Sequence, residues 1–329
     1  MKYIAALGAV LLFVTACGDP DGSSVPPPFG YGPETITVYV PDGEAWLEDT
    51  RITLEYDEHG RVTTSTQDSW TAGLWEPSLQ TVNTYDDKGR LDRSTSRAHV
   101  GEAWEDRQRS AFAYVGEDRL DKITLYDYLQ FEWQPQSRRS FAYDEEDGGT
   151  GRLLAITSES YSGNEWHDSY RVAYSYRDDG RLNEATVYNY LWDAWERSTR
   201  EAHAYDAVGR ITALTSSSWI AEEWVSQSEV SYTFDGRGRL EQALQDRVLG
   251  GDPESTEPEN RVSYTYGGDG RLQRRVVERY AGGLWENHKR TDFGFTDAGG
   301  SATFEVSPEP FRWWVFEYYA QGEPNAYAR

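Results

Sequence analysis

Acid–base chemistry in this chain would have to come from its carboxylates and its histidines. Four aspartates follow a tyrosine and precede, after a short interval, a glycine and an arginine: Asp57, Asp86, Asp144 and Asp206. An aspartate at the start of a turn accepts backbone hydrogen bonds, and a glycine supplies the positive φ that such a turn needs. The pattern therefore predicts a structural role for these carboxylates.

Histidines give no constellation for catalysis or metal binding. They fall at five different places relative to the tyrosine–aspartate pattern: His59, His99, His167, His203 and His288. The sequence also holds no zinc-type His/Cys cluster, no Walker loop and no Gly-x-Ser-x-Gly elbow. We expect a protein that is not an enzyme and that carries no cofactor or metal. The acidic stretch 144–147 has oxygen ligands of the kind Ca²⁺ prefers, but a solvated acidic loop is the favoured interpretation.

Composition excludes one class of partner. The 329 residues carry a formal net charge of −24 with a pI of about 4.6, and nucleic-acid binding needs a clustered basic surface. The apolar residues are largely aromatic, with 23 Tyr and 13 Trp. The chain is therefore expected to build its core from aromatic side chains and not to bind nucleic acid.

The N-terminus has the layout of a secretory signal. Lys2 precedes an apolar run from Ile4 to Val14, which is shorter than the roughly 17–25 residues of a membrane-spanning helix. Val14-Thr15-Ala16-Cys17 resembles the bacterial lipobox, and Cys17 is the only cysteine of the chain. This resemblance implies a signal peptide over 1–16 and a lipid on Cys17 that holds the protein to a membrane. An ordinary secreted protein with a chance cysteine is the alternative.

Residues 17–34 predict a flexible tether. Their composition is rich in Gly, Asp, Ser and Pro and cannot bury a core. Gly18 after the cysteine favours sorting to the outer membrane or cell surface, where we expect the protein to be anchored.

Most of the remaining sequence is one repeat. Motifs of the form Tyr-Asp-x-x-Gly-Arg-Leu recur with an aromatic first residue at 56, 85, 114, 143, 176, 205, 234, 266 and, degenerate, 295. The step is 29 residues except for two longer ones. Tryptophans follow the same period, at Trp46, Trp75, Trp104, Trp133, Trp166, Trp195, Trp224, Trp285 and Trp314. Such a fixed period is typical of a repeat array in which each unit packs on its neighbours.

Each unit predicts an antiparallel hairpin. Two stretches of about ten residues alternate with short turns. A glycine bulge at Gly60 should pair Tyr56 with Val62. Strict alternation then places Leu182, Tyr188 and Trp195 on one face. It places a rank of basic residues on the other face: Arg51, Arg109, Arg138, Arg171, Arg200, Arg261 and Arg290.

The predicted fold is all-β: a repeat array of antiparallel hairpins over residues 35–320 that forms a long coiled or curled meander sheet, followed by a tail over 321–329. Open sheets of more than about ten strands curl, split or close, so we expect the aromatic face to turn inward. Whether the sheet closes stays open at this point. A transmembrane barrel is disfavoured because mid-strand positions are Thr, Ser, Gln and Arg, where such a barrel has an apolar band.

The turn motif resembles the YD repeat of the RHS group. The resemblance covers nearly all of residues 35–320 and implies a ribbon of hairpins, which in some members winds into a shell around a toxin. Two features depart from that family: the longer period, and the lack of an autocleavage segment or toxin domain after Phe295. From this resemblance we therefore predict the hairpin architecture for this chain and not a role in toxin delivery.

These observations predict a cell-envelope lipoprotein with a structural or surface-interaction role. A surface protein or a glycan is the expected partner besides the membrane. The alternative is a carbohydrate-binding lipoprotein that stacks sugars on exposed aromatic rings, with candidate residues Trp75, Trp104, Trp133, Trp166, Trp195, Trp224 and Trp285. A core role for these tryptophans is favoured because aliphatic residues are few.

Overall fold

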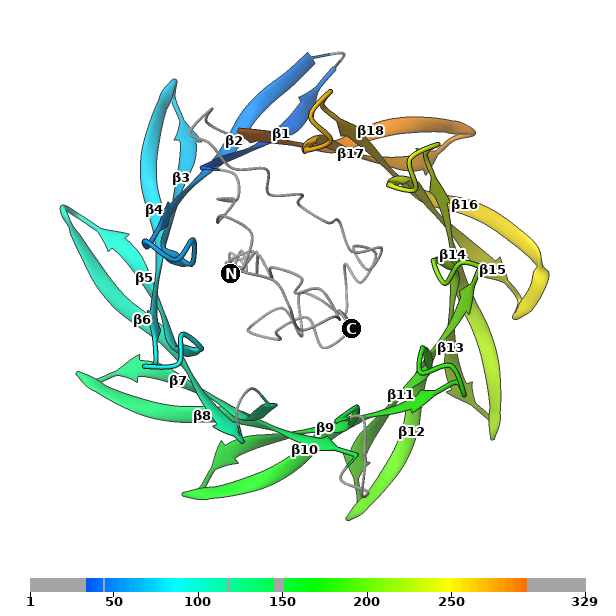
Figure 1. Cartoon of the computed structure of the whole chain (residues 1–329), viewed down its shortest axis with the longest axis horizontal. Coiled ribbons are helices and arrows are strands. Elements are labelled where there is room, and N and C mark those ends of the chain that lie inside the picture. Colours follow the sequence, from blue (N-terminus) through cyan, green and yellow to red (C-terminus); the bar gives the residue numbers. More distant parts are fainter. Residues whose placement is uncertain (1–33, 44, 117–118, 145–150, 295–329) are drawn as a thin grey trace, which may run out of the picture.

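The hairpins form a closed barrel. The computed structural model describes residues 34–43, 45–116, 119–144 and 151–294, and these form one sheet of 18 antiparallel strands (Figure 1). Each strand pairs with the next, and β18 pairs with β1, so that the sheet has no free edge. The strands are β1 (Thr35–Asp42), β2 (Ala45–Tyr56), β3 (Val62–Thr71), β4 (Leu74–Tyr85), β5 (Leu91–Val100), β6 (Ala103–Val115), β7 (Arg119–Leu129), β8 (Glu132–Tyr143), β9 (Leu153–Ser162), β10 (Glu165–Tyr176), β11 (Leu182–Leu191), β12 (Ala194–Tyr205), β13 (Ile211–Ile220), β14 (Glu223–Phe234), β15 (Leu240–Leu249), β16 (Asp252–Tyr266), β17 (Leu272–Ala281) and β18 (Leu284–Gly294).

Closure settles the question that the sequence left open. The all-β hairpin array is confirmed, and the curled sheet is a complete barrel. The repeat that begins at Phe295 and contains Trp314 lies outside the described residues. So do the predicted signal peptide over 1–16, the tether apart from Glu34, and the tail over 321–329. No helix in the described part of the chain is long and apolar enough to cross a membrane.

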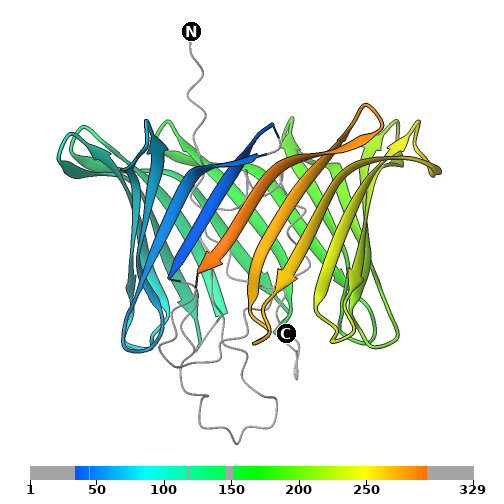
Figure 2. The ribbon, with the colours of Figure 1, turned by 90° about the horizontal axis from the view of Figure 1, so that it is seen from above.

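The two ends of the barrel differ. The Tyr-Asp turns lie at the narrower end, and the other hairpin turns flare outward at the wider end (Figure 2). Pairing between neighbouring hairpins stops partway along the strands: β4 pairs with β5 only from Leu79 to Tyr85. Between Leu79 and its turn, the hairpin β3–β4 continues as a two-stranded tip that bends away from the neighbouring hairpins. The other hairpins end in similar tips (Figure 1).

Two β-bulges in each repeat direct the side chains. In the repeat that starts at Leu182, Asn183 has no partner across the β10–β11 register, and Ser198 has none across the β11–β12 register. A bulge adds one residue to one strand and so changes which side chains share a face. Two bulges restore the original alternation, and the same arrangement occurs in the hairpins β3–β4 and β5–β6.

The apolar residues line the inside of the barrel. Side chains converge on the concave face of a closed sheet and diverge on its convex face. The face that carries Ile156, Val172 and Leu182 is buried, whereas Thr53 and Glu55 on the opposite face are exposed. We therefore assign the buried face to the interior. Its residues form three clusters along the wall, and the two larger ones extend from Leu91 to Ala185 and from Ile211 to Val277.

Candidate functional site

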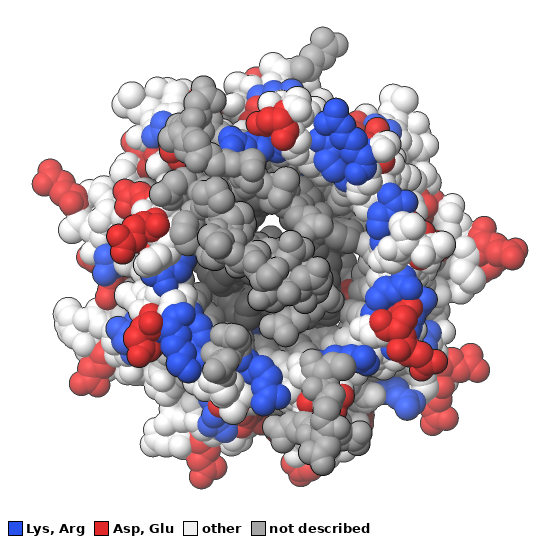
Figure 3. All heavy atoms as spheres, viewed as in Figure 1, with Lys and Arg blue, Asp and Glu red and all other residues white. Residues whose placement is uncertain are grey.

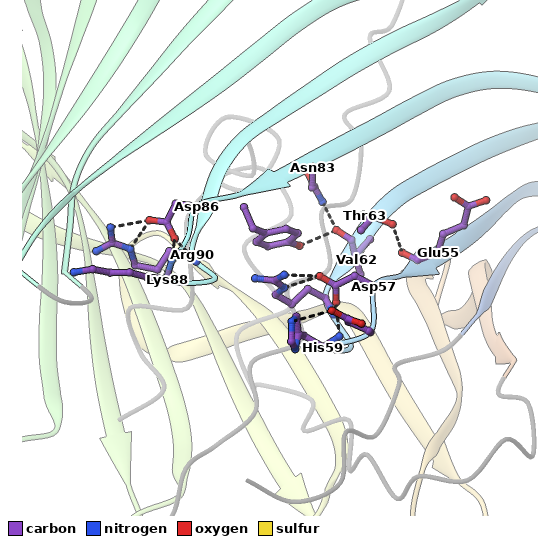
Figure 4. Close-up of polar contacts among 12 residues, drawn as sticks. Glu55, Asp57, His59, Val62, Thr63, Asn83, Asp86, Lys88 and Arg90 are labelled. Carbon is purple, nitrogen blue, oxygen red and sulfur yellow. Dashed lines mark hydrogen bonds and ion pairs between the residues drawn. The ribbon is translucent and has the colours of Figure 1, made fainter.

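The residues that recur in the Tyr-Asp turns of this chain stabilise the turn itself. Asp57 Oδ1 accepts hydrogen bonds from the backbone N–H groups of His59 and Arg61, both at 2.9 Å, and Oδ2 accepts one from Arg61 Nε at 2.7 Å. Figure 4 shows this turn beside the equivalent one at Asp86 and Arg90. Gly60 has a φ of +74°, which a side chain would strain. The predicted pairing of Tyr56 with Val62 is confirmed.

The same turn also joins one repeat to the next. The Arg61 guanidinium lies 4.4 Å from the ring centroid of Tyr85, and the Tyr85 hydroxyl donates a 2.7 Å hydrogen bond to the carbonyl oxygen of Val62. Arg90 and Tyr114 repeat the contact at 4.4 Å. Burial raises the pKa of Tyr114 to about 12, against the opposing effect of the Arg90 charge. This phenol therefore stays protonated at neutral pH and acts as a hydrogen-bond donor.

Asp235, of another such turn, is held as a carboxylate. The backbone N–H of Arg239 donates to Asp235 Oδ1, the Arg239 side chain donates to Oδ2, and these hydrogen bonds lower the pKa of Asp235 below its usual range. A general acid at neutral pH would need a raised pKa. The structure thus uses these groups in turns, as the sequence pattern predicts.

Acid should weaken the turns. Because the pKa of Asp235 is lower in the folded protein than in the unfolded chain, its contribution to stability is complete above the unfolded value, near 4, and is lost as the pH falls below it. Asp235→Asn should lower the urea midpoint at pH 7, and the difference from wild type should shrink toward pH 2. Glu76→Gln, at a hairpin tip, is the matched control. A difference that stays constant with pH would contradict this role.

Tryptophans of the repeat lie on the outer face near the ends of the hairpin tips, one residue pair away from the turn, as Trp75 does beside the pair of Thr71 and Leu74. Trp75 pairs across the hairpin with Trp70, with ring centroids 4.9 Å apart, and Arg51 of the preceding hairpin lies 4.7 Å from the Trp75 ring centroid. Equivalent aromatic contacts occur at Trp104, Trp133, Trp166, Trp195, Trp224 and Trp285. All seven candidate tryptophans are half-buried, so their rings are only partly available for a ligand.

The predicted division of faces is wrong. The sequence analysis placed the tryptophans with the leucines and opposite the arginines, whereas the structure places Trp195, Tyr190 and Arg200 on the outer face and Leu182 on the inner one. The physical reason is the pair of bulges, which a period-two pattern does not reveal. Arginine guanidinium groups therefore stack on the tryptophans: Arg109 on Trp133, Arg138 on Trp166, Arg200 on Trp224 and Arg261 on Trp285, at 4.4–4.8 Å.

Several of these arginines are also ion-paired across strands. Arg138 donates to both carboxylate oxygens of Glu159, at 2.6 and 2.7 Å, and Arg261 contacts Glu278 in the same way. Hydrogen bonds from Arg138 lower the pKa of Glu159. Most residues of the arginine rank thus form ion pairs on the outer wall: Arg51, Arg138, Arg200, Arg261 and Arg290.

Exposed apolar side chains gather at the flared end, a feature that the repeat pattern did not indicate. Of the fifteen large apolar residues that are exposed in the described part of the chain, twelve lie on the hairpin tips. We call these twelve the rim residues: Val40, Leu47, Trp70, Leu74, Val100, Leu129, Phe131, Leu191, Trp192, Ile220, Leu249 and Leu284. Exposed carboxylates such as Glu76, Glu132 and Glu223 accompany them.

The two ends of the barrel also differ in charge. Seen from the turn end, Lys and Arg side chains surround the mouth with Asp and Glu side chains beside them, and further Asp and Glu side chains stand at the periphery (Figure 3). Most of the turn arginines are paired with aspartates of their own turns, as in Arg90 with Asp86. The turn end thus carries paired charges, whereas the rim carries exposed carboxylates beside its apolar side chains.

Eight non-glycine residues of the described hairpin tips have positive φ, and two of them are large aromatic residues. The hairpin tips are two-residue turns with positive φ, a geometry that favours glycine, and two of them are Gly250-Gly251 and Gly282-Gly283. Phe131 has a φ of +68° and Trp192 a φ of +53°, and these side chains are 89% and 94% exposed. A bulky side chain in this conformation costs about 1–2 kcal/mol. Neither residue gains burial that would offset this cost.

Three other candidate sites were considered from the sequence: a metal site, the lipidation site at Cys17 and the histidines. Residues 34–43, 45–116, 119–144 and 151–294 contain no group of three or more His, Cys, Asp or Glu that could hold a metal ion. The acidic stretch 144–147 falls outside these ranges except for Asp144, and Cys17 lies outside them. His203 is a buried residue of the inner face, paired with Leu214.

The similarities of this chain to known proteins are similarities of architecture. No family model matches the chain, and no curated protein matches it. A crystal structure of a porin-like protein from Bacteroides uniformis is 12% identical, with coverage of 82% of this chain and 98% of that one and a TM-score of 0.39. The TcdB2-TccC3-TEV structure is 15% identical, with coverage of 77% and 14% and a TM-score of 0.38.

A third similarity is to a protein of unknown function from Bacteroides fragilis, which is 14% identical, with coverage of 37% and 89% and a TM-score of 0.32. This chain thus spans about a seventh of the TcdB2-TccC3-TEV chain and nearly all of the porin-like one. At these identities and TM-scores no activity follows from the similarities. The chain is an 18-stranded barrel of hairpins that is similar to a porin-like protein and to part of a TccC3 complex.

Proposed function

We propose that the protein is a lipid-anchored, non-enzymatic surface-interaction protein of the cell envelope, which presents the flared rim to a partner protein. The observation that carries the proposal is the gathering of twelve exposed apolar residues on the hairpin tips. These residues recur on successive hairpin tips and so place exposed apolar side chains at one end of the barrel, and exposed apolar surface marks interaction sites in soluble proteins. The anchor is inferred from the sequence around Cys17.

Strain at Phe131 and Trp192 supports the same conclusion. Glycine would suit the backbone of both positions better, yet both hold a large and almost fully exposed aromatic ring. Strained conformations that persist without a packing benefit are typical of functional positions. Aromatic residues are also enriched among the residues that dominate binding at protein interfaces.

Charge indicates the chemistry of the partner. The carboxylates of the rim would repel an anionic surface and attract a basic one. We therefore expect a partner protein whose contact surface combines basic and apolar side chains. Glycan binding by the seven tryptophans remains the alternative prediction, and their half-buried, arginine-stacked rings do not favour it.

The test uses tip variants that do not harm the fold. Phe131→Gly combined with Trp192→Gly relieves the strained turns, so the free energy of unfolding should stay unchanged or rise. Surface cross-linking on intact cells should capture a partner with the wild type and at least about tenfold less with the double variant, because interface aromatics contribute 2 kcal/mol or more. Val115→Ser combined with Val208→Ser, exposed apolar residues at the opposite end, is the matched control. Equal capture by all three proteins would overturn the proposal.

A further inference from the structure

The two most exposed of the rim residues lie on nearby hairpin tips. Phe131 is on the tip of β7–β8 and Trp192 on the tip of β11–β12, and only the tip of β9–β10 separates them (Figure 1). In these three hairpins the residues that pair only within their own hairpin are 128–136, 161–169 and 190–198. We call these three ranges together the aromatic sector.

Backbone strain is concentrated on the same sector. Of the eight non-glycine residues with positive φ in the described part of the chain, five lie on it: Gln130, Phe131, Asn164, Trp192 and Asp193. Across the barrel, on the tips of β15–β16, β17–β18 and β1–β2, the described residues with positive φ are glycines: Gly43, Gly250, Gly251, Gly282 and Gly283. Strained positions cluster at binding sites, so the strain singles out one side of the rim.

A partner protein of ordinary size covers only part of the rim. Eighteen strands spaced about 4.8 Å apart give the wall a circumference of at least about 86 Å. A standard interface buries about 800 Å² on each side, which is a patch about 30 Å across. Because one hairpin takes up roughly 10 Å of the wall, such a patch spans about three neighbouring hairpins. A partner that contacts Phe131 and Trp192 together therefore sits on the aromatic sector.

Carboxylates determine which chemistry fits this sector. Five exposed carboxylates lie on it: Glu132, Glu165, Asp168, Asp193 and Glu196. Among the residues that the structure describes, none of the five has an ion-pair partner. The one arginine of the sector, Arg197, lies 4.8 Å from the ring centroid of Trp219 on the next hairpin. The sector is therefore net negative and complementary to a basic surface.

The middle tip differs from its two neighbours. None of the twelve rim residues lies on the tip of β9–β10, where Ser162, Asn164 and Glu165 are exposed instead. A partner on the sector thus meets an aromatic ring on each side and a polar, acidic surface between them. Exposed carboxylates also occur across the barrel, as at Glu254 and Glu286, so the charge defines the kind of partner and the aromatic rings define its place.

We infer that one partner protein docks on the aromatic sector, with a basic centre against the tip of β9–β10 and apolar patches on both sides that receive Phe131 and Trp192. This inference rests on the proposed function, which assigns the partner to the rim without a position on it. The tips across the barrel complete the wall and do not contact the partner.

Site-specific photo-crosslinking on intact cells tests the position. The full chain carries the photoreactive residue p-benzoylphenylalanine in place of Ser162 or, in a second protein, in place of Ala281. Both residues are exposed and directly precede a hairpin turn, with Glu165 and Leu284 opposite them, so the two probes are matched. The probe at 162 should give a protein–protein product on irradiation, and the probe at 281 should give none above the unirradiated background.

Neutralising carboxylates tests the chemistry. With the probe at 162, one substitution on each tip of the sector should lower the yield of the product by about tenfold, because up to three exposed ion pairs are lost: Glu132→Gln, Glu165→Gln and Asp193→Asn. The matched control removes the same charge from exposed positions across the barrel and should leave the yield unchanged: Asp42→Asn, Glu254→Gln and Glu286→Gln.

The outcomes separate this inference from the proposed function. Equal yields from the probes at 162 and 281, or equal losses with the two sets of neutral variants, would overturn the inference and leave a partner bound elsewhere on the rim. A product at 162 that contains lipid, glycan or a second copy of this chain would also overturn it. General cross-linking that still captures a partner while 162 gives no product contradicts the inference alone. Failure of every method to capture a protein would overturn the proposed function itself.

Discussion

Replacing Cys17 by serine should release the protein from the membrane. After cell fractionation, the membrane-bound share should fall by at least about tenfold, because two or more acyl chains anchor a protein stably and the variant would carry none. Outward positions of β2 in the paired region are Arg51, Thr53 and Glu55, whereas a membrane-spanning barrel has an apolar band there. The measurement is the ratio of protein in the membrane pellet to protein in the supernatant.

Ser23→Ala, in the expected tether, is the control for the Cys17 experiment and should stay in the pellet. A Cys17→Ser protein that remains in the pellet after a high-salt wash would show that the barrel itself holds the membrane. That result would contradict both the lipid anchor and the polar character assigned to the outer wall.

Weakening the seam between β1 and β18 should have the largest effect on stability. Ile36 is 2% exposed and lies between Ile52 and Phe293, so it joins the first hairpin to the last. Ile36→Ala should lower the free energy of unfolding by about 2–5 kcal/mol, the usual cost of truncating a buried isoleucine. Chemical denaturation monitored by tryptophan fluorescence would measure the loss.

Thr37→Ala is the control for the seam, since Thr37 lies on the outer face of the same strand and should change the unfolding free energy by no more than about 0.5 kcal/mol. Ile36→Ala should also raise aggregation, because an opened seam exposes two unpaired edges. Equal stability of the two variants would mean that closure contributes little to the fold.

Much of the architecture could be predicted because the turn chemistry is local. Asp57, Gly60 and Arg61 act within a few residues of one another, so their spacing suffices to predict the turn and the pairing of Tyr56 with Val62. The cross-strand contact of Trp70 with Trp75 follows from the same hairpin register. Repetition of these local units predicts an antiparallel hairpin array without reference to distant contacts.

Which side chains lie on the inner face of the sheet and which on the outer face could not be predicted in the same way. Asn183 and Ser198 have no sequence signature that marks them as bulges, yet each shifts the register of the strand pair that contains it. The prediction that Trp195 lies with Leu182 failed for this reason. The rim was missed because exposure at Phe131 and Trp192 depends on where the tips separate from the wall.

The sequence by itself determined the repeat, its hairpins, the turns that join them and the single cysteine that suits a lipid anchor, because each of these depends on residues close together in the chain. Only the tertiary structure decided that β18 returns to β1, which face lies inside and where the apolar tips gather. These features depend on twist and bulges accumulated over eighteen strands, and on contacts between residues as far apart as Ile36 and Phe293.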